Sequence, residues 1–201
     1  VSAAYPLAQR NFLLRGVFSK LLLFTMFFSG GLIPTYLMIK TLGILNTPLA
    51  VILPGAASVT NIIITRTFFQ TTLPAELREA AFLDGCSHLR YLFSITLPLS
   101  KAILAVMALY YGVGQWNSFF NAMIYLTNRD LYTLQLVLRE ILLTSSVTLE
   151  TGGDPQALAE QQRIGEIIKY GVIVVAAVPA LIAYPFVQKF FIKGVMIGSL
   201  K

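Results

Sequence analysis

The sequence has 201 residues, of which 56% are hydrophobic and only 12% charged, and its mean hydropathy is +0.74. Soluble domains carry about 25% charged residues, so the composition excludes an ordinary water-soluble protein and indicates an integral membrane protein. The single cysteine, Cys86, cannot form an internal disulfide.

Four stretches contain no Asp, Glu, Lys or Arg, and each has the length of a membrane span. A bilayer core of about 30 Å needs roughly 20 helical residues. No alternating pattern of strands is present, so the stretches predict helices. They are Leu21–Ile39, Thr41–Thr65, Ala102–Asn128 and Tyr170–Gln188.

Glycines and prolines are expected to loosen these helices. The second helix is expected to start at Pro48, a favoured first helical position. Close packing and kinks explain such residues, and a pathway lined by kinked helices is the alternative. Gly30, Gly31 and Pro34 are expected to interrupt the first stretch and Gly112 and Gly114 the third, while Pro54 and Gly55 lie in the second and Pro179 and Pro185 in the fourth.

Charge placement predicts an orientation. If the loop around Glu79 is cytoplasmic, ten Lys or Arg residues and three acids lie on that side, against five and six on the other. Lys and Arg favour the cytoplasmic side of a membrane. An even number of spans then places both ends of this chain, near Arg10 and Lys201, in the cytoplasm.

The segment Arg129–Lys169 is too polar to span a membrane. Leu134, Leu138 and Ile141 are part of a helical periodicity that predicts an amphipathic helix on the outer side. Thr144–Pro155 is expected to be an exposed loop, with a turn at Gly152-Gly153-Asp154-Pro155 and a helix start at its end. This region is either an outer ledge or a docking surface for an external partner.

Several kinds of chemistry have no residues to support them. The sequence has no phosphate-binding loop with a Gly-Lys pair and no Gly-x-Ser-x-Gly nucleophile turn. His88, the only histidine, has no set of metal ligands around it. None of the four stretches holds a carboxylate, which disfavours an ion-coupled transporter. We therefore expect no catalytic residue, metal or cofactor.

Polar and aromatic residues within the stretches are candidates for a substrate path. Amide side chains are costly in lipid unless they are paired, so they should face other helices or a cavity. Aromatic rings can stack on sugar rings. Interhelical hydrogen bonds and interfacial aromatic residues are the simpler explanation. The candidates are Tyr36, Asn61, Tyr110, Gln115, Trp116 and Asn117.

A polar loop between two apolar stretches carries the most specific pattern. Glu76 and Glu79 favour the start of a short helix after Pro74. Leu77, Ala80, Ala81 and Asp84 should share one face of that helix, where small side chains allow close approach of another protein. Gly85 can adopt the left-handed conformation that ends the helix, and a second helix should follow.

The pattern Glu79-Ala80-Ala81-x-x-x-Gly85-x9-Ile95-x-Leu97-Pro98 resembles the EAA motif of permease subunits of ATP-binding cassette (ABC) importers. In that family the loop is a coupling helix that docks into a cytoplasmic ATPase. The resemblance extends over the whole chain. Trp116–Phe120 and Tyr184–Lys189 are similar to the carbohydrate branch, and within it to LplC-like or YtcP-like permeases for complex saccharides.

The resemblance implies an all-α, polytopic transmembrane bundle with the MetI-like fold of type I ABC importers. Residues 1–201 would form the permease domain and residues 74–98 its cytoplasmic coupling loop. The implied partners are an ABC ATPase dimer, a second homologous permease, an extracellular solute-binding protein and membrane lipid, without nucleic acid. The implied location is the bacterial plasma membrane. The residues implied in coupling are Glu79, Ala80, Ala81, Asp84, Gly85, Ile95, Leu97 and Pro98.

The sequence as a whole departs from the family in its number of membrane spans. Family members have about six, whereas this sequence supplies four and a stub, so we expect the first two helices to be missing. The function that the resemblance implies is ATP-driven import of sugars, oligosaccharides in particular. Three alternatives stay open: an ABC permease for a non-sugar solute, a membrane subunit that docks an ATPase without transporting, and an ATP-independent channel.

Overall fold

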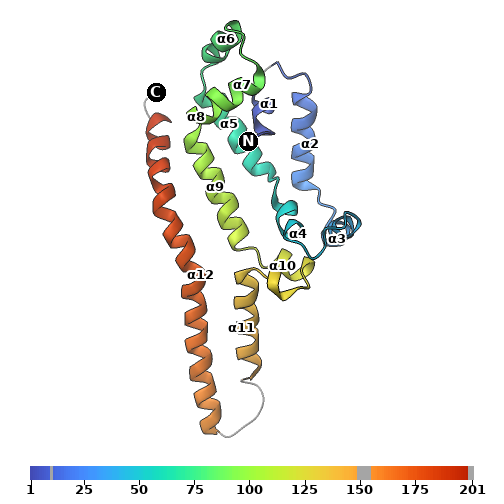
Figure 1. Ribbon diagram of the computed structural model, residues 1–201, viewed down its shortest axis with the longest axis vertical. Helices are drawn as coiled ribbons and strands as arrows, with labels where there is room; N and C mark the ends of the chain where they lie inside the picture. Colours follow the sequence, from blue (N-terminus) through green and yellow to red (C-terminus); the bar gives the residue numbers. More distant parts are fainter. Residues whose placement is uncertain (10, 149–154, 199–201) are drawn as a thin grey trace. The chain divides into compact units, whose positions relative to one another are not determined.

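The computed structural model describes residues 1–9, 11–148 and 155–198, and within these ranges the chain is helical, without strands. This confirms the predicted all-α class. The helices are α1 (Ala4–Ala8), α2 (Arg15–Phe27), α3 (Leu32–Thr41), α4 (Pro48–Ile52), η1 (Leu53–Gly55), α5 (Val59–Thr72), α6 (Ala75–Leu83), α7 (His88–Tyr91), η2 (Leu92–Thr96), α8 (Leu97–Leu99), α9 (Lys101–Trp116), α10 (Phe120–Tyr125), η3 (Arg129–Leu131), α11 (Leu134–Thr148) and α12 (Pro155–Gly198) (Figure 1).

The helix breaks follow the glycines and prolines in part. A gap between α2 and α3 contains Gly31, whose φ is +85°. Thr47 is extended and α4 begins at Pro48, the predicted start. Pro54 and Gly55, expected to lie within this helix, are instead in a 3₁₀ turn that follows α4. The expected interruption at Gly112 and Gly114 is wrong, because α9 continues through both.

Helix length and composition identify only some of the predicted membrane spans without ambiguity. Arg163–Ile182, within α12, is long and apolar enough to cross a membrane alone. Three further spans exist if α2 with α3, α4–η1 with α5, and α7–α8 with α9 each count as one bent span. The described residues therefore offer between one and four spans by length and composition, and the predicted four stay a prediction.

The outer region differs from expectation at its loop. The predicted amphipathic helix is confirmed as α11, which continues to Thr148, so Thr144–Thr148 is helical rather than a loop. The predicted turn at Gly152–Asp154 lies outside the described residues. Helix α12 begins at Pro155, as predicted, and is 44 residues long, so it already includes the polar residues before Tyr170.

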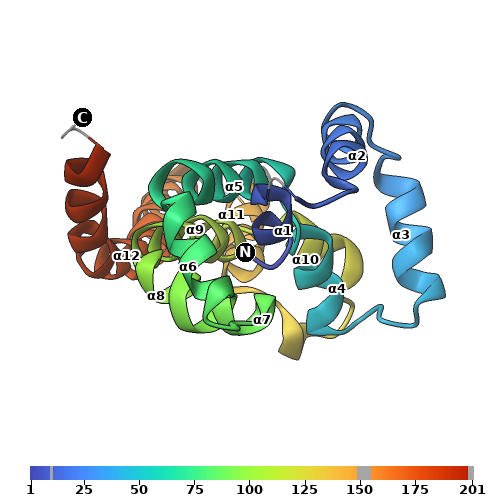
Figure 2. The same ribbon diagram turned by 90° about the horizontal axis from the view of Figure 1, so that it is seen from above.

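The chain divides into two compact units. The first comprises Val1–Pro34, Gly55–Tyr111 and the residues from Val187, and the second comprises Thr35–Pro54 and Gly112–Phe186. Buried residues of α1, α5, α6, α7, η2 and α9 form the core of the first unit, in which α1 lies beside α5 (Figure 2). Two smaller clusters, around Val51 with Ala122 and around Ile39 with Tyr125, stabilise the second unit.

Candidate functional site

The loop that matches the EAA pattern begins with a regular helix and a Gly stop. Pro74 is extended at the N-cap of α6, and Glu76 lies in the first turn, where it complements the helix dipole. At the other end, Cys86 N–H donates to the Ala81 carbonyl at 2.9 Å and Gly85 N–H donates to the Phe82 carbonyl at 3.1 Å. These two bonds form a Schellman motif. Gly85 has φ +75°, the left-handed conformation predicted for it.

The second half of the loop is a helix with an irregular turn. Ser87 caps α7 by accepting from Arg90 N–H at 3.4 Å. The next five residues, Leu92–Thr96, form a π-helix, which closes when Leu97 N–H donates to the Leu92 carbonyl. Pro98 has no N–H to continue the α-helical series, which explains a register change directly before it. After Ser100 the chain bends by 84° into α9.

Three hydrogen bonds attach the loop and α5 to the N-terminal segment. Arg78 Nη1 donates to Gln9 Oε1. The Tyr5 hydroxyl donates to the His88 carbonyl at 3.4 Å, and Gln70 Nε2 donates to the Ala8 carbonyl, also at 3.4 Å. The loop is therefore held against a segment that precedes it by about seventy residues or more.

Aromatic side chains of the loop and of α1 pack against one another next to these bonds. The centroid of the Phe82 ring lies 4.7 Å from that of the His88 ring and 5.6 Å from that of the Tyr91 ring. The Tyr91 and Tyr5 ring centroids are 6.4 Å apart. Tyr5 and Tyr91 are both buried. Burial, and secondarily the neighbouring Tyr91, raises the pKa of Tyr5 above its ordinary value, while Arg78 opposes this shift. The Tyr5 hydroxyl therefore stays protonated and able to donate.

The structure separates the residues implied in coupling into exposed and packed ones. Glu79, Ala80, Asp84, Gly85 and Pro98 are exposed. Ala81 is buried, with 8% of its surface accessible, and Ile95 and Leu97 pack against the same core. The expectation that Ala80 and Ala81 share one exposed face is therefore wrong: Ala80 is available to a partner, whereas Ala81 packs α6 onto the body.

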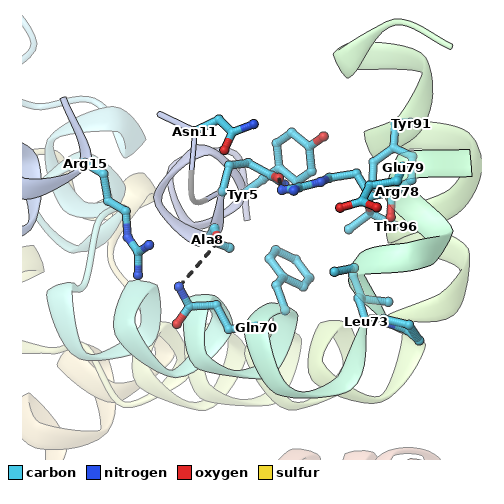
Figure 3. A pocket seen from close by; sticks show the side chains of 14 residues that line it. Tyr5, Ala8, Asn11, Arg15, Gln70, Leu73, Arg78, Glu79, Tyr91 and Thr96 are labelled. Carbon is cyan, nitrogen blue, oxygen red and sulfur yellow. Dashed lines mark hydrogen bonds between the residues drawn. The ribbon is translucent and has the colours of Figure 1, made fainter. Parts of the chain in front are cut away.

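A polar cavity of about 510 Å³ opens between the loop, α1, α2 and α5 (Figure 3). Arg78 and Glu79 line it from α6, Arg15 from α2 and Gln70 from α5. No group of three His, Cys, Asp or Glu side chains that could hold a metal ion occurs in the part of the chain that is described.

The candidate path residues belong to different environments. Asn61 and Tyr110 are in the first unit, where Asn61 lines a separate cavity of about 210 Å³ and Tyr110 is exposed. In the second unit the Trp116 Nε1–H donates to the Ala176 carbonyl at 3.0 Å. Tyr36 stacks on Tyr125 with ring centroids 6.3 Å apart.

The two remaining candidates, Gln115 and Asn117, are half-buried and exposed respectively. Trp116 and Tyr36 thus have structural contacts, which is the simpler of the two explanations given for them.

Sequence reasoning missed the residues that hold the loop in place. Tyr5, Gln9 and Arg78 lie outside the EAA pattern, and Gln9 and Arg78 are 69 positions apart. Among the residues that sequence reasoning missed, Ser87 had a local signal, because Ser is a favoured N-cap residue before a short helix.

Comparison with known proteins gives one consistent family. Residues 4–197 match the model of the family described as "Binding-protein-dependent transport system inner membrane component". Protein LplC of Bacillus subtilis (strain 168) is 48% identical over 98% of this chain and 66% of its own length. The polygalacturonan/rhamnogalacturonan transport system permease protein YtcP of the same organism is 42% identical over 98% of this chain and 68% of its own length.

A solved structure agrees with these relatives. It is described as a bacterial ABC transporter involved in the import of the acidic polysaccharide alginate, and it matches with a TM-score of 0.78 and 29% identity over 94% of this chain and 66% of that chain. The MetI-like fold is thereby confirmed. This chain spans about two thirds of the length of the proteins it matches. The chain belongs to the family of binding-protein-dependent transport system inner membrane components.

Proposed function

We propose that this chain is the transmembrane permease subunit of an ABC importer for sugars, and that residues 74–98 couple it to a separate ATPase. The observation that carries the proposal is the loop itself. Its exposed residues, Glu79, Ala80 and Asp84, lie on a short helix whose other side is packed through Ala81 and bonded to α1 through Arg78. Such a helix presents a surface to a partner and is fixed firmly enough to transmit the partner's movement.

The family membership supports the choice of partners. A binding-protein-dependent system includes a solute-binding protein by its description, and the matched structure is that of an ABC transporter. We propose an ATPase dimer at the loop, a second homologous permease beside this chain and the binding protein on the opposite side. ATP binding would close the ATPase dimer, and the loop would pass this movement to the spans, which would switch from outward-facing to inward-facing.

The relatives support a saccharide as substrate. YtcP is described as a permease for polygalacturonan and rhamnogalacturonan, and a further relative, 30% identical, as one for arabinooligosaccharides. We propose oligosaccharides as the substrate class. Glu79, Ala80, Asp84 and Gly85 would contact or shape the docking surface, while Ala81, Ile95, Leu97 and Pro98 would hold it in position. The proposed orientation places this loop and both ends of the chain in the cytoplasm.

The proposal is tested with the full-length permease, its partner permease, the ATPase and the binding protein in liposomes. We expect ATP hydrolysis to rise when a liganded binding protein is added, and labelled oligosaccharide to accumulate inside. Asp84→Lys reverses a charge on the exposed end of α6 and should reduce the amount of ATPase that co-purifies. Asp130→Lys, at an exposed site on η3 in the second unit, is the matched control and should leave the ATPase bound.

The outcomes separate the alternatives. If oligosaccharides fail and another solute both stimulates hydrolysis and accumulates, the permease role holds and the sugar assignment is wrong. ATPase binding without uptake of any solute would favour a docking subunit. Uptake that continues without ATP would favour a channel and would overturn the coupling role of the loop.

A further inference from the structure

A polar seam runs between α2 and α5 in the first unit. We define it by Arg15 and Ser19 on α2 and by Arg66 and Gln70 on α5. Within each helix the two residues are four positions apart, so they lie on the same face one turn from each other. Arg66 Nη1 donates to Ser19 Oγ at 3.2 Å and joins the two faces.

The seam opens into the polar cavity described above. Arg15 and Gln70 both line that cavity, and Figure 3 shows Arg15 extending from α2 toward α5, where Gln70 is bonded to the Ala8 carbonyl. Arg15, Ser19 and Arg66 are half-buried. The cavity therefore reaches the seam at Arg15 and Gln70, while Ser19 and Arg66 continue the seam beyond the residues that line the cavity.

The seam itself holds no carboxylate, and Glu79 on α6 is the one acidic residue among the described residues that line the cavity. The first 75 residues contain no Asp or Glu but five Lys or Arg. Neither Arg15 nor Arg66 pairs with a carboxylate in the described part of the chain. The Nε of Arg66 is buried and has no hydrogen-bond partner among the described residues. A buried guanidinium nitrogen without a partner carries a desolvation penalty, which an anion at this position would remove.

The seam lies toward the end of a helix that belongs to a candidate membrane span. Arg66 lies six residues before Thr72, the end of α5, which is about 9 Å along the helix. The headgroup region of each leaflet is about 5–8 Å thick. Both leaflets carry phosphates close to the ends of membrane spans, so the argument holds whichever side the loop is on. Arg also binds phosphate oxygens in a bidentate manner that Lys cannot reproduce.

We propose that Arg15, Ser19, Arg66 and Gln70 form a binding site for the phosphate group of an anionic phospholipid headgroup. Arg15 and Arg66 supply the charge and the bidentate donors, Ser19 holds Arg66 against α2, and Gln70 contributes its amide at the cavity wall. Basic pockets between membrane helices are a recurring way to hold anionic headgroups. The site requires only that α2 and α5 lie in a membrane, so it does not depend on transport or on the identity of the substrate.

The experiment is native mass spectrometry of the full-length permease, purified in a mild detergent and supplied in separate samples with phosphatidylglycerol, phosphatidylcholine or inorganic phosphate. We expect one retained phosphatidylglycerol per chain and no equivalent retention of phosphatidylcholine. Arg15→Gln and Arg66→Gln should each lower this occupancy about tenfold or more. Lys20→Gln is the matched control: it removes one charge from an exposed position beside Ser19 and should leave the occupancy unchanged.

Arg66→Lys keeps the positive charge but loses the planar guanidinium. We therefore expect it to retain phosphatidylglycerol at an occupancy between those of the native protein and Arg66→Gln, a difference that a purely structural role of Arg66 would not produce. Thermal unfolding identifies misfolded variants. If Arg66→Gln misfolds, the lipid occupancy of Arg15→Gln decides whether the site exists. Equal retention of phosphatidylcholine, no retention at all, or unchanged occupancy in a folded Arg15→Gln variant would overturn the site. Retention of inorganic phosphate without retention of phosphatidylglycerol would assign the seam to a free anion and overturn the lipid.

Discussion

The proposed coupling loop and the predicted path residues differ in how the structure holds them. In the loop, side chains from α1, α5, α6 and α7 converge, and the C-terminal end of α6 is set by the two backbone bonds of the Schellman motif. The path residues are divided between the two units. Their contacts are separate from one another, such as the hydrogen bond from the Trp116 indole to the Ala176 carbonyl. The loop thus has a shape that this chain determines by itself, whereas a path needs further surfaces to be complete.

The difference has a physical basis. A coupling helix must keep its position while a partner pulls or pushes on it, so it needs contacts within its own chain. A sugar path must release its substrate, so its polar groups have to be available in turn to each helix that moves. Variants in the two regions should therefore fail in different ways: loop variants should lose coupling, and path variants should lose affinity for the sugar.

The largest effect is expected from Gly85→Val. At φ +75° a side chain is strained, although nothing lies within 4 Å of the added Cβ. The strain is about 1–2 kcal/mol in that conformation, and it should be relieved by undoing the Schellman turn. We expect uptake in proteoliposomes to fall about tenfold or more while ATP hydrolysis continues.

Gly16→Ala is the matched control, because Gly16 lies within α2, has open space around it and has no positive φ. It should retain uptake. Normal uptake in the Gly85→Val variant would remove the coupling role proposed for the loop.

Arg78→Ala should have the next largest effect. It removes the charged donor to Gln9, and hydrogen bonds to charged groups contribute about 1.5–3 kcal/mol; because Arg78 is only half-buried, we expect the lower end of that range. A double-mutant cycle with Gln9→Ala, read by thermal unfolding, isolates this bond. The exposed Arg90→Ala is the control for the loss of charge. Strictly additive effects of Arg78→Ala and Gln9→Ala would show that the two side chains do not interact.

Trp116→Phe tests the path side of the comparison. It removes the indole N–H that donates to Ala176, which should cost about 1 kcal/mol of unfolding free energy and leave the apparent affinity for sugar unchanged. Tyr170→Phe, at an exposed position on α12 outside the candidate path residues, is the control. A weaker sugar affinity with unaltered stability would instead place Trp116 in the substrate path.

Tyr5→Phe should give the smallest effect. The hydroxyl donates to the His88 carbonyl at 3.4 Å, a long bond for which about 0.5 kcal/mol is expected. The ring contacts with Tyr91 remain in the variant. Tyr170→Phe, at an exposed site on α12, is the control in thermal unfolding. A loss as large as that of Arg78→Ala would show that this bond, rather than Arg78, holds the loop to α1.

The sequence predicted the parts of the structure that depend on neighbouring residues. The start of α4 at Pro48, the break near Gly31 and the left-handed Gly85 follow from backbone preferences that need no tertiary contact. The glycines of α9 were misjudged because glycine weakens a helix only by about 1 kcal/mol, which the rest of a sixteen-residue helix offsets.

Features that depend on tertiary contacts could not be predicted from the sequence. Ala81 and Ala80 are equally small, and only the packing of α6 decides that one is buried. The bond between Gln9 and Arg78 joins residues that no local pattern relates, and the polar seam depends on which faces of α2 and α5 meet.

The π-helix before Pro98 has a consequence for how this loop tolerates change. A π-turn holds one residue more than an α-turn, and each residue of an α-helix rotates its successor by about 100°. Deleting one residue from Leu92–Thr96 would convert the π-turn into an α-turn instead of rotating α7 by that angle relative to α8, and the Tyr91 ring would stay beside the Tyr5 and Phe82 rings it now packs against. Leu92–Thr96 therefore holds one residue more than a regular α-helix needs here, so the loss of one residue should be tolerated better than the insertion of another.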